Sequence, residues 1–100
     1  MNAKTELLEA IGSIAIKCAK IKYEKWGNPI KEFLLQSGYS ENDLITFLND
    51  LDFEYDDGYG PQEIEGTVWL KDGTWLERGE YDGSEWWEHR YLPTIPPKLL

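Results

Sequence analysis

The residues with the clearest spacing for chemistry are acidic. Asp52, Glu54, Asp56 and Glu63 fall at positions 1, 3, 5 and 12 of a calcium-binding EF-hand loop. Position 6 of such a loop needs a glycine for its sharp turn, and Asp57 stands there instead. The residues that follow have the pattern of a strand, whereas an EF-hand continues into a helix. We therefore expect no metal and no cofactor.

Catalytic groups other than carboxylates are scarce. The chain has one histidine, His89, and one cysteine, Cys18. His89 lies in a strand-like run, where a cross-strand contact is expected, and Cys18 falls on an apolar stripe, as a core residue does. Paired carboxylates could hydrolyse a glycoside while tryptophans stack on its rings, but such a site needs a cleft that desolvates the acids. No nucleophile, base and orienting group come together, so we predict a protein that is not an enzyme.

The negative charge is concentrated in the second half of the chain. The formal net charge over 100 residues is -9. Residues 1–50 carry six basic residues and seven acids, and residues 51–100 carry four basic residues and twelve acids. Binding to nucleic acid or to an anionic membrane requires basic residues, so we exclude direct binding to either. The single cysteine and the lack of a signal peptide or a long apolar segment favour the cytoplasm.

Two different periodicities divide the chain into a helical half and a strand half. Apolar residues at three- and four-residue steps, with N-cap residues and helix-stopping glycines, predict three helices, over residues 4–25, 29–38 and 40–50. Beyond residue 50 the period is two, and Asp-Gly turns separate runs rich in Val, Thr, Trp and Tyr. These runs predict antiparallel strands over 62–70, 74–81 and 85–92, with a short one at 52–56.

One α+β domain is therefore expected. Three N-terminal helices (4–50) pack on a three- or four-stranded antiparallel β-meander (51–92), and a Pro-rich tail (93–100) follows.

The side chains of this meander divide between two faces. With a two-residue turn at Asp72-Gly73 and a three-residue turn at 82–84, strand parity predicts a core face of Ile64, Val68, Leu70, Trp75, Tyr81, Trp87 and Tyr91. On the opposite face, parity exposes Trp69, Leu76 and Trp86 and sets Arg78 across from Glu88.

We interpret the second face as a partner-binding site with an acidic rim. Its candidate residues are Trp69, Trp86, Glu63, Glu65, Glu80, Asp82, Glu85 and Glu88. The alternatives are that the tryptophans pack on both sides of the sheet or lie buried under the Pro-rich tail, and that the acids only solvate the sheet. Carboxylates two residues apart on a strand lie about 6.6 to 7 Å apart, close to the phosphate spacing of a nucleic acid strand. Such a surface could occupy a basic nucleic-acid channel.

Residues 53–97 contain the runs YDDGYG, DGTW and RGEYDGSEWW. In these runs the chain resembles a group of small uncharacterised proteins carried by bacteriophages and prophages of enteric bacteria. The resemblance implies an accessory protein made in the cytoplasm of the infected bacterium. In that setting we expect it to bind and inhibit a host protein, with a nucleic-acid enzyme or a defence nuclease as the leading partner, as anti-CRISPR and anti-restriction proteins do. The alternative is an interaction module, or a self-associating protein such as a homodimer, with no partner related to nucleic acids.

Overall fold

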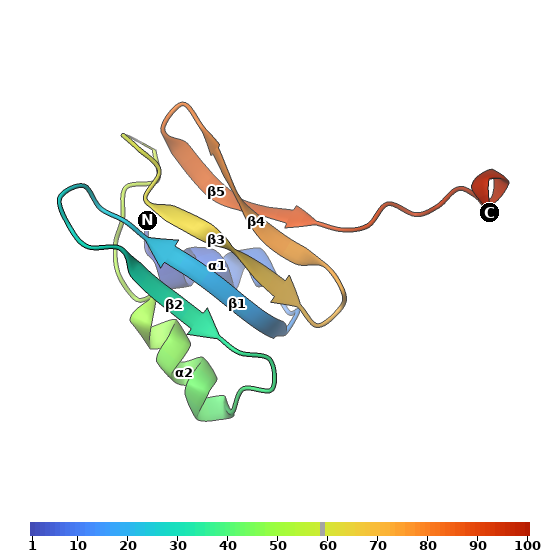
Figure 1. Ribbon diagram of the computed structural model, residues 1–100, viewed down its shortest axis with the longest axis horizontal. Coiled ribbons are helices and arrows are strands. Elements are labelled where there is room, and N and C mark those ends of the chain that lie inside the picture. The colour runs from blue at the N-terminus through green and yellow to red at the C-terminus, as the bar shows by residue number, and fades with distance from the viewer. Residues whose placement is uncertain (59) are drawn as a thin grey trace.

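The computed structural model describes residues 1–58 and 60–100 and has an α+β fold (Figure 1). Tyr59, in the YDDGYG run, lies outside the described residues. Over the described chain, two helices accompany one antiparallel sheet of five strands in the order β2-β1-β3-β4-β5. The elements are α1 (Ala3–Ile11), β1 (Ile16–Tyr23), β2 (Lys31–Leu35), α2 (Glu41–Asp50), β3 (Ile64–Leu70), β4 (Trp75–Tyr81), β5 (Ser84–Arg90) and a 3-10 turn (Pro97–Leu99).

The predicted first helix, 4–25, is wrong beyond Ile11. The helix ends at Gly12, which has φ of 59°, and β1 then runs through the middle of the sheet. A β-bulge between Ile16 and Cys18 shifts the alternation, so Ile16 and Ala19 are both buried although they are three residues apart. Because of this bulge, buried residues of β1 recur at a three-residue step, which is the spacing expected of a helix.

The predicted second helix, 29–38, is also wrong, because residues 31–35 form the edge strand β2. Its partner is β1, with Ala19 paired to Leu35 and Tyr23 to Lys31. Pairing with a neighbouring strand outweighs the local N-cap and proline signals, since it buries Leu35 in the core.

The predicted third helix is confirmed as α2. Ser40 Oγ accepts a hydrogen bond from Asp43 N at 3.1 Å, and Asp43 Oδ2 accepts one from Ser40 N at 3.0 Å. This capping box starts the helix where the sequence places it. Phe47 is the buried residue by which α2 joins the core.

The predicted meander is confirmed as β3, β4 and β5, whereas residues 52–56 do not form a strand. Only an isolated bridge from Glu54 to Asn2 occurs there. Beyond Arg90 the chain leaves the sheet as an extended arm (residues 91–100), drawn at the right of Figure 1. Within the described residues, no helix has the length and apolar character needed to cross a membrane.

Both turn lengths assumed for the meander are wrong by one residue, in opposite directions. The first turn holds three residues between Leu70 and Thr74, which are joined by a Leu70 N to Thr74 O hydrogen bond of 2.9 Å. The second holds only Asp82 and Gly83, with φ of 51° and 85°, as a type I′ hairpin turn requires. Strand β4 is therefore turned over relative to the prediction, while β3 and β5 keep their expected faces.

The turned strand changes the face of five predicted positions, and one of them, Glu80, moves from the outer to the inner side of β4, opposite Glu85. Leu76 is fully buried and Arg78 faces inward, opposite Trp87 and not Glu88. Trp75 and Tyr81, predicted in the core, lie on the other side, where Tyr81 is exposed. Tyr91 is exposed as well, in the arm.

The core occupies one face of the sheet, here called the inner face. Its buried side chains come from β1 to β4, from both helices and from the loop after α2: Ala3, Leu7, Ile16, Ala19, Ile21, Leu35, Phe47, Leu51, Tyr55, Ile64, Val68, Leu70 and Leu76. Helix α1 lies behind the sheet in Figure 1, and α2 lies beside β2. In the part of the chain that the structure describes, the opposite, outer face of β1, β3, β4 and β5 therefore has no helix over it.

Gly66 allows β1 and β3 to approach closely in the middle of this sheet. It pairs with Ile21 and has φ of 152°. A Cβ atom built on it would clash with the Lys20 carbonyl oxygen and would lie 2.8 Å from Ile21 Cα. Only glycine fits there without moving a backbone.

Candidate functional site

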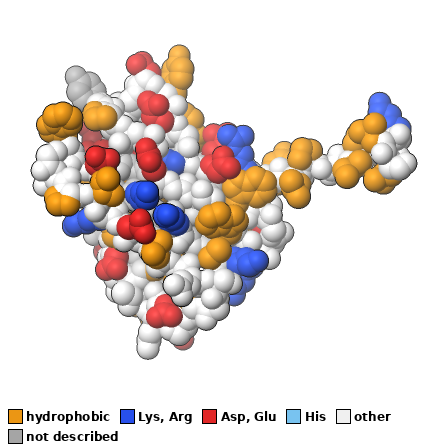
Figure 2. All heavy atoms as spheres, viewed as in Figure 1, with side chains coloured by type: hydrophobic (Ala, Val, Ile, Leu, Met, Phe, Trp, Pro, Cys, Tyr) orange, Lys and Arg blue, Asp and Glu red, His pale blue; other side chains and the backbone are white. Residues whose placement is uncertain are grey.

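The outer face combines three tryptophans with charges of both signs. Strand registers place Lys20 and Lys22 of β1 beside Thr67 and Glu65 of β3, and Trp69 beside Trp75 of β4. The remaining side chains on this face of β4 and β5 are Glu77, Tyr81, Ser84, Trp86, Glu88 and Arg90. Figure 2 shows apolar, basic and acidic side chains intermixed over the sheet.

Trp69 and Trp86 lie on this face as predicted, with 43% and 38% of their surface exposed. Trp75 lies beside them as the cross-strand neighbour of Trp69. The two-residue turn assumed from the sequence places Trp75 on the core face instead. We call Trp69, Trp75 and Trp86 the tryptophan platform. Its members come from three adjacent strands, so a bound surface would contact β3, β4 and β5 together.

Two indole rings of the platform are held by carboxylates on their own strands. Trp75 Nε1 donates to Glu77 Oε1 at 2.8 Å, and Trp86 Nε1 donates to Glu88 Oε2 at 2.8 Å. The Trp86 ring also lies over Gly79, where an added Cβ would come within 2.7 Å of Trp86 Nε1 and Cε2. Rings fixed in this way lose little conformational entropy when a partner binds.

A shallow depression of about 220 Å³ adjoins the platform on the β1 side. Lys20, Lys22, Glu65, Thr67 and Trp69 line it, with Gly66 at its floor. It therefore offers two ammonium groups, one carboxylate and one aromatic ring to a ligand, a mixture suited to a protein surface more than to a single anion.

The eight predicted site residues do not form one patch. Glu65, Trp69, Trp86 and Glu88 share the outer face. Asp82 lies in the β4–β5 turn. Glu80 points to the inner side of β4, opposite Glu85, and its Oε1 accepts a hydrogen bond from Gly83 N at 3.3 Å. Glu63 precedes β3, and its Oε2 accepts one from Asp56 N at 3.1 Å.

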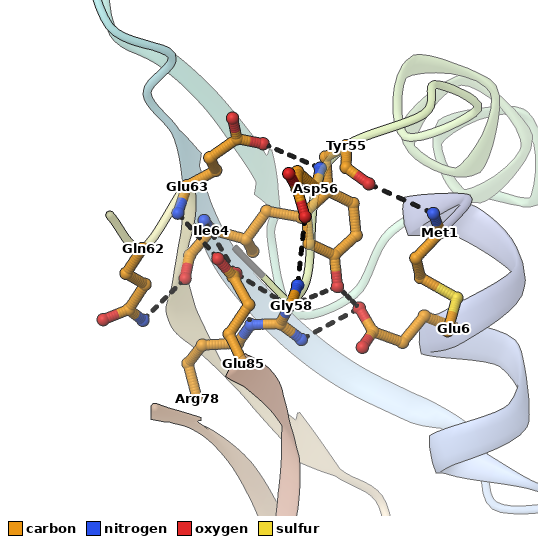
Figure 3. Close-up of polar contacts among 10 residues, drawn as sticks. All are labelled: Met1, Glu6, Tyr55, Asp56, Gly58, Gln62, Glu63, Ile64, Arg78 and Glu85. Atoms are coloured by element: carbon orange, nitrogen blue, oxygen red, sulfur yellow. Dashed lines mark hydrogen bonds and ion pairs between the residues drawn. The ribbon is translucent and has the colours of Figure 1, made fainter. Parts of the chain in front are cut away.

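Glu85 contradicts its predicted role, because it is buried on the inner face. Its side chain is fully shielded from solvent. Glu85 Oε2 accepts a hydrogen bond from Glu63 N at 2.7 Å, and Oε1 accepts one from Ile64 N at 3.0 Å (Figure 3). Glu85 thus anchors the start of β3 and offers no charge to a partner.

Glu85 belongs to a buried polar cluster with Glu6, Tyr55 and Arg78. Arg78 Nη1 donates to Glu6 Oε1 at 2.9 Å, and Arg78 Nη2 donates to Glu85 Oε1 at 2.8 Å and to Tyr55 Oη at 2.5 Å (Figure 3). The Tyr55 hydroxyl donates in turn to Glu6 Oε1. The Arg78 guanidinium also lies 4.9 Å from the Trp87 ring centroid. Four segments distant in sequence are thereby tied together: α1, the loop after α2, β4 and β5.

The buried polar cluster is fully hydrogen-bonded and stabilises the fold. In the described part of the chain, every buried side-chain nitrogen and oxygen has a hydrogen-bond partner. Burial by itself lowers the pKa of Arg78, but its hydrogen bond to Glu85 and the charge of Glu6 outweigh that effect and raise the pKa. The guanidinium therefore stays charged and paired with both carboxylates.

Tyr55 should make the stability of the fold fall at alkaline pH. Burial, followed by the hydrogen bond to Glu6, raises the pKa of Tyr55 above its ordinary value of 10.0. The folded chain therefore keeps this proton where the unfolded chain loses it, so unfolding becomes easier above about pH 10, by up to about 1.4 kcal/mol per pH unit. Urea unfolding from pH 9 to 11 should show a shallower decline for Tyr55→Phe than for the wild type.

Tyr81→Phe is the matched control for that experiment. Tyr81 is 77% exposed, so this variant should keep the wild-type decline. Equal slopes for the wild type and Tyr55→Phe would contradict the role assigned to Tyr55. Part of the decline should survive in Tyr55→Phe, because burial also raises the pKa of Tyr23.

The residues considered for other chemistry are dispersed. Among the described residues, no three His, Cys, Asp or Glu side chains lie together as a metal site would require. His89 Nε2 lies 2.7 Å from Thr74 Oγ1, a cross-strand contact of the expected kind. Cys18 lies half-buried in β1 opposite Trp69, and not on the predicted helix.

Comparisons with protein-family models, with curated proteins and with solved structures gave no match.

Proposed function

We propose that this chain is a non-enzymatic binding protein whose outer sheet face docks on a host protein and blocks it. The tryptophan platform carries the proposal. Trp69, Trp75 and Trp86 lie on a face without a helix over it, and hydrogen bonds fix two of the rings. Rigid aromatic side chains with a charged surround are the usual energetic anchors of protein interfaces.

The charge of the chain supports a basic partner, with a nucleic-acid enzyme as the leading class. A net charge of -9 speeds encounter with a positively charged surface. Glu65 and Glu88 border the platform, and Asp82 adds a carboxylate at the β4–β5 turn. In this proposal these carboxylates occupy the enzyme's nucleic-acid site, as an accessory protein of a bacteriophage would do in its host.

A second candidate is an interaction module whose partner is unrelated to nucleic acids. Lys20, Lys22 and Arg90 lie on the same face as the platform, so that face is not uniformly acidic. Salt separates the two candidates, since binding by charge mimicry weakens steeply with ionic strength and binding by an apolar interface does not.

Affinity capture from bacterial lysate tests the proposal when the wild type and substituted variants of this chain are compared as baits. Wild-type bait should retain a nucleic-acid enzyme at low salt and release it at high salt. Glu65→Lys with Glu88→Lys should abolish capture, and Trp69→Ala should weaken it by about tenfold or more, as loss of an interface anchor does. The purified enzyme should then be inhibited by the wild type in competition with its nucleic acid.

Matched controls on α2 keep the result specific. Glu41→Lys and Ile45→Ala change the same kinds of residue at exposed helix positions away from the platform, and both should capture normally. Capture that survives the double charge reversal would rule out mimicry. A captured protein that tolerates high salt and has no nucleic-acid substrate would favour the second candidate.

A further inference from the structure

The arm, residues 91–100, exposes apolar side chains that the rest of the chain does not cover. Leu92 is 78% exposed and Ile95 is 58% exposed, and Tyr91, Leu99 and Leu100 are exposed as well. In Figure 1 the arm leaves the end of β5 and extends away from the sheet, and Figure 2 shows apolar side chains along its length. A soluble chain gains free energy when such a segment is buried against another surface.

The backbone of the arm is suited to an aromatic surface. Pro93, Pro96 and Pro97 restrict it, and Pro96 has φ of -59° and ψ of 139°, which is polyproline II geometry. Polyproline II segments are recognised by surfaces lined with Trp and Tyr, and they lose little entropy on binding because they are already extended. The tryptophan platform is such a surface.

The length of the arm also matches. Lys98, its one charged side chain, would meet a face on which Glu65, Glu77 and Glu88 lie among Lys20, Lys22 and Arg90. The six residues before the 3-10 turn, 91–96, would span about 19 Å in polyproline II geometry, whereas the four strands of the outer face span about 14 Å across. One arm is therefore long enough to cross the whole outer face.

We propose that the arm of each copy lies across the tryptophan platform of a second copy, forming a reciprocal dimer. The arm does not turn back onto its own sheet. It continues outward from β5, and Leu92 precedes a proline, which disfavours the helical backbone angles that a tight reversal would use. In this closed twofold assembly, each arm is buried on the partner's platform, and each platform is covered by the partner's arm.

This inference goes beyond the proposed function, because it concerns the chain alone and its test contains no other protein. It also adds regulation, since the arm and a host protein would compete for the same platform.

Sedimentation of the full chain over a range of concentrations tests the exchange. The wild type should form a dimer, and Ile95→Glu should raise its dissociation constant at least tenfold. The matched control is Ile45→Glu, which makes the same change at a 50% exposed isoleucine on α2 and should leave the dimer intact. A monomeric wild type at every concentration, or equal dimerisation of wild type and Ile95→Glu, would overturn the proposal.

A mixing experiment distinguishes exchange from folding back. The variant Trp69→Glu has an intact arm and an impaired platform. The variant Ile95→Glu has an impaired arm and an intact platform. Each variant alone should be monomeric, while their mixture should form a heterodimer held by one arm on one platform. Absence of the heterodimer would overturn reciprocal exchange, provided circular dichroism shows Trp69→Glu folded. If Trp69→Glu is not folded, Trp69→Ala replaces it under the same criterion.

Discussion

Arg78→Ala should lower the free energy of unfolding by about 3 to 5 kcal/mol, the usual cost of removing one partner from a buried ion pair. The Arg78 side chain is only 2% exposed and contacts both Glu6 and Glu85. Its removal leaves two buried carboxylates without their cation and Tyr55 without one hydrogen bond. Because a domain of this size has about 5 to 15 kcal/mol of total stability, the variant should be close to unfolding at room temperature. Urea denaturation at pH 7 measures the loss.

Arg90→Ala is the control for that experiment. Arg90 Nε lies 3.7 Å from Glu77 Oε2 in an exposed ion pair, which is worth at most about 1 kcal/mol. A triple variant, Arg78→Met with Glu6→Gln and Glu85→Gln, should lose less stability than Arg78→Ala. It removes the buried carboxylate charges together with their cation, so no buried charge lacks a partner. A cost for Arg78→Ala equal to that of Arg90→Ala would show that the buried polar cluster does not stabilise the fold.

Gly66→Ala should be the most damaging glycine substitution in the described chain, with a cost of about 4 kcal/mol or more. The new Cβ meets backbone atoms of Lys20 and Ile21, which cannot rotate away as a side chain could. The strands β1 and β3 must therefore separate at the centre of the sheet, and the Lys20–Lys22 side of the outer face should shift with them. Thermal unfolding monitored by tryptophan fluorescence would record the loss.

Gly58→Ala provides the comparison. An added Cβ at Gly58 has no atom within 4 Å, and its backbone is not in the left-handed region, so the cost should stay within about 0.5 kcal/mol. A similar cost for both substitutions would mean that the close approach at Gly66 is not required for the fold.

The sequence allowed the fold class and the meander to be predicted, but not the position of every strand. The capping box at Ser40 is a local signal, and α2 starts there as expected. The strands β1 and β2 depend on pairing between distant residues, and the bulge after Ile16 imitated a helix. No local pattern could show that pairing, since it forms only when the chain is folded.

The candidate site was predicted only in part for a related reason. Trp69 and Trp86 lie on the strands whose faces were assigned correctly, so their exposure followed from parity. Trp75 and Arg78 lie on β4, where one residue in each turn reversed the faces. Glu85 has the parity of Trp87, which was predicted in the core, so its inward direction followed from parity. The register error on β4 hid only its partner Arg78.

The buried polar cluster has a consequence for how the chain folds during synthesis. Glu6 is made early, but its partners Tyr55 and Arg78 are 49 and 72 residues further along. Strand β1 likewise has to wait for β3, which lies in the second half of the chain. Contacts of such separation form slowly because long loops must close first. The nascent N-terminal half therefore has no stable core of its own, and native structure should appear only after β5 has left the ribosome.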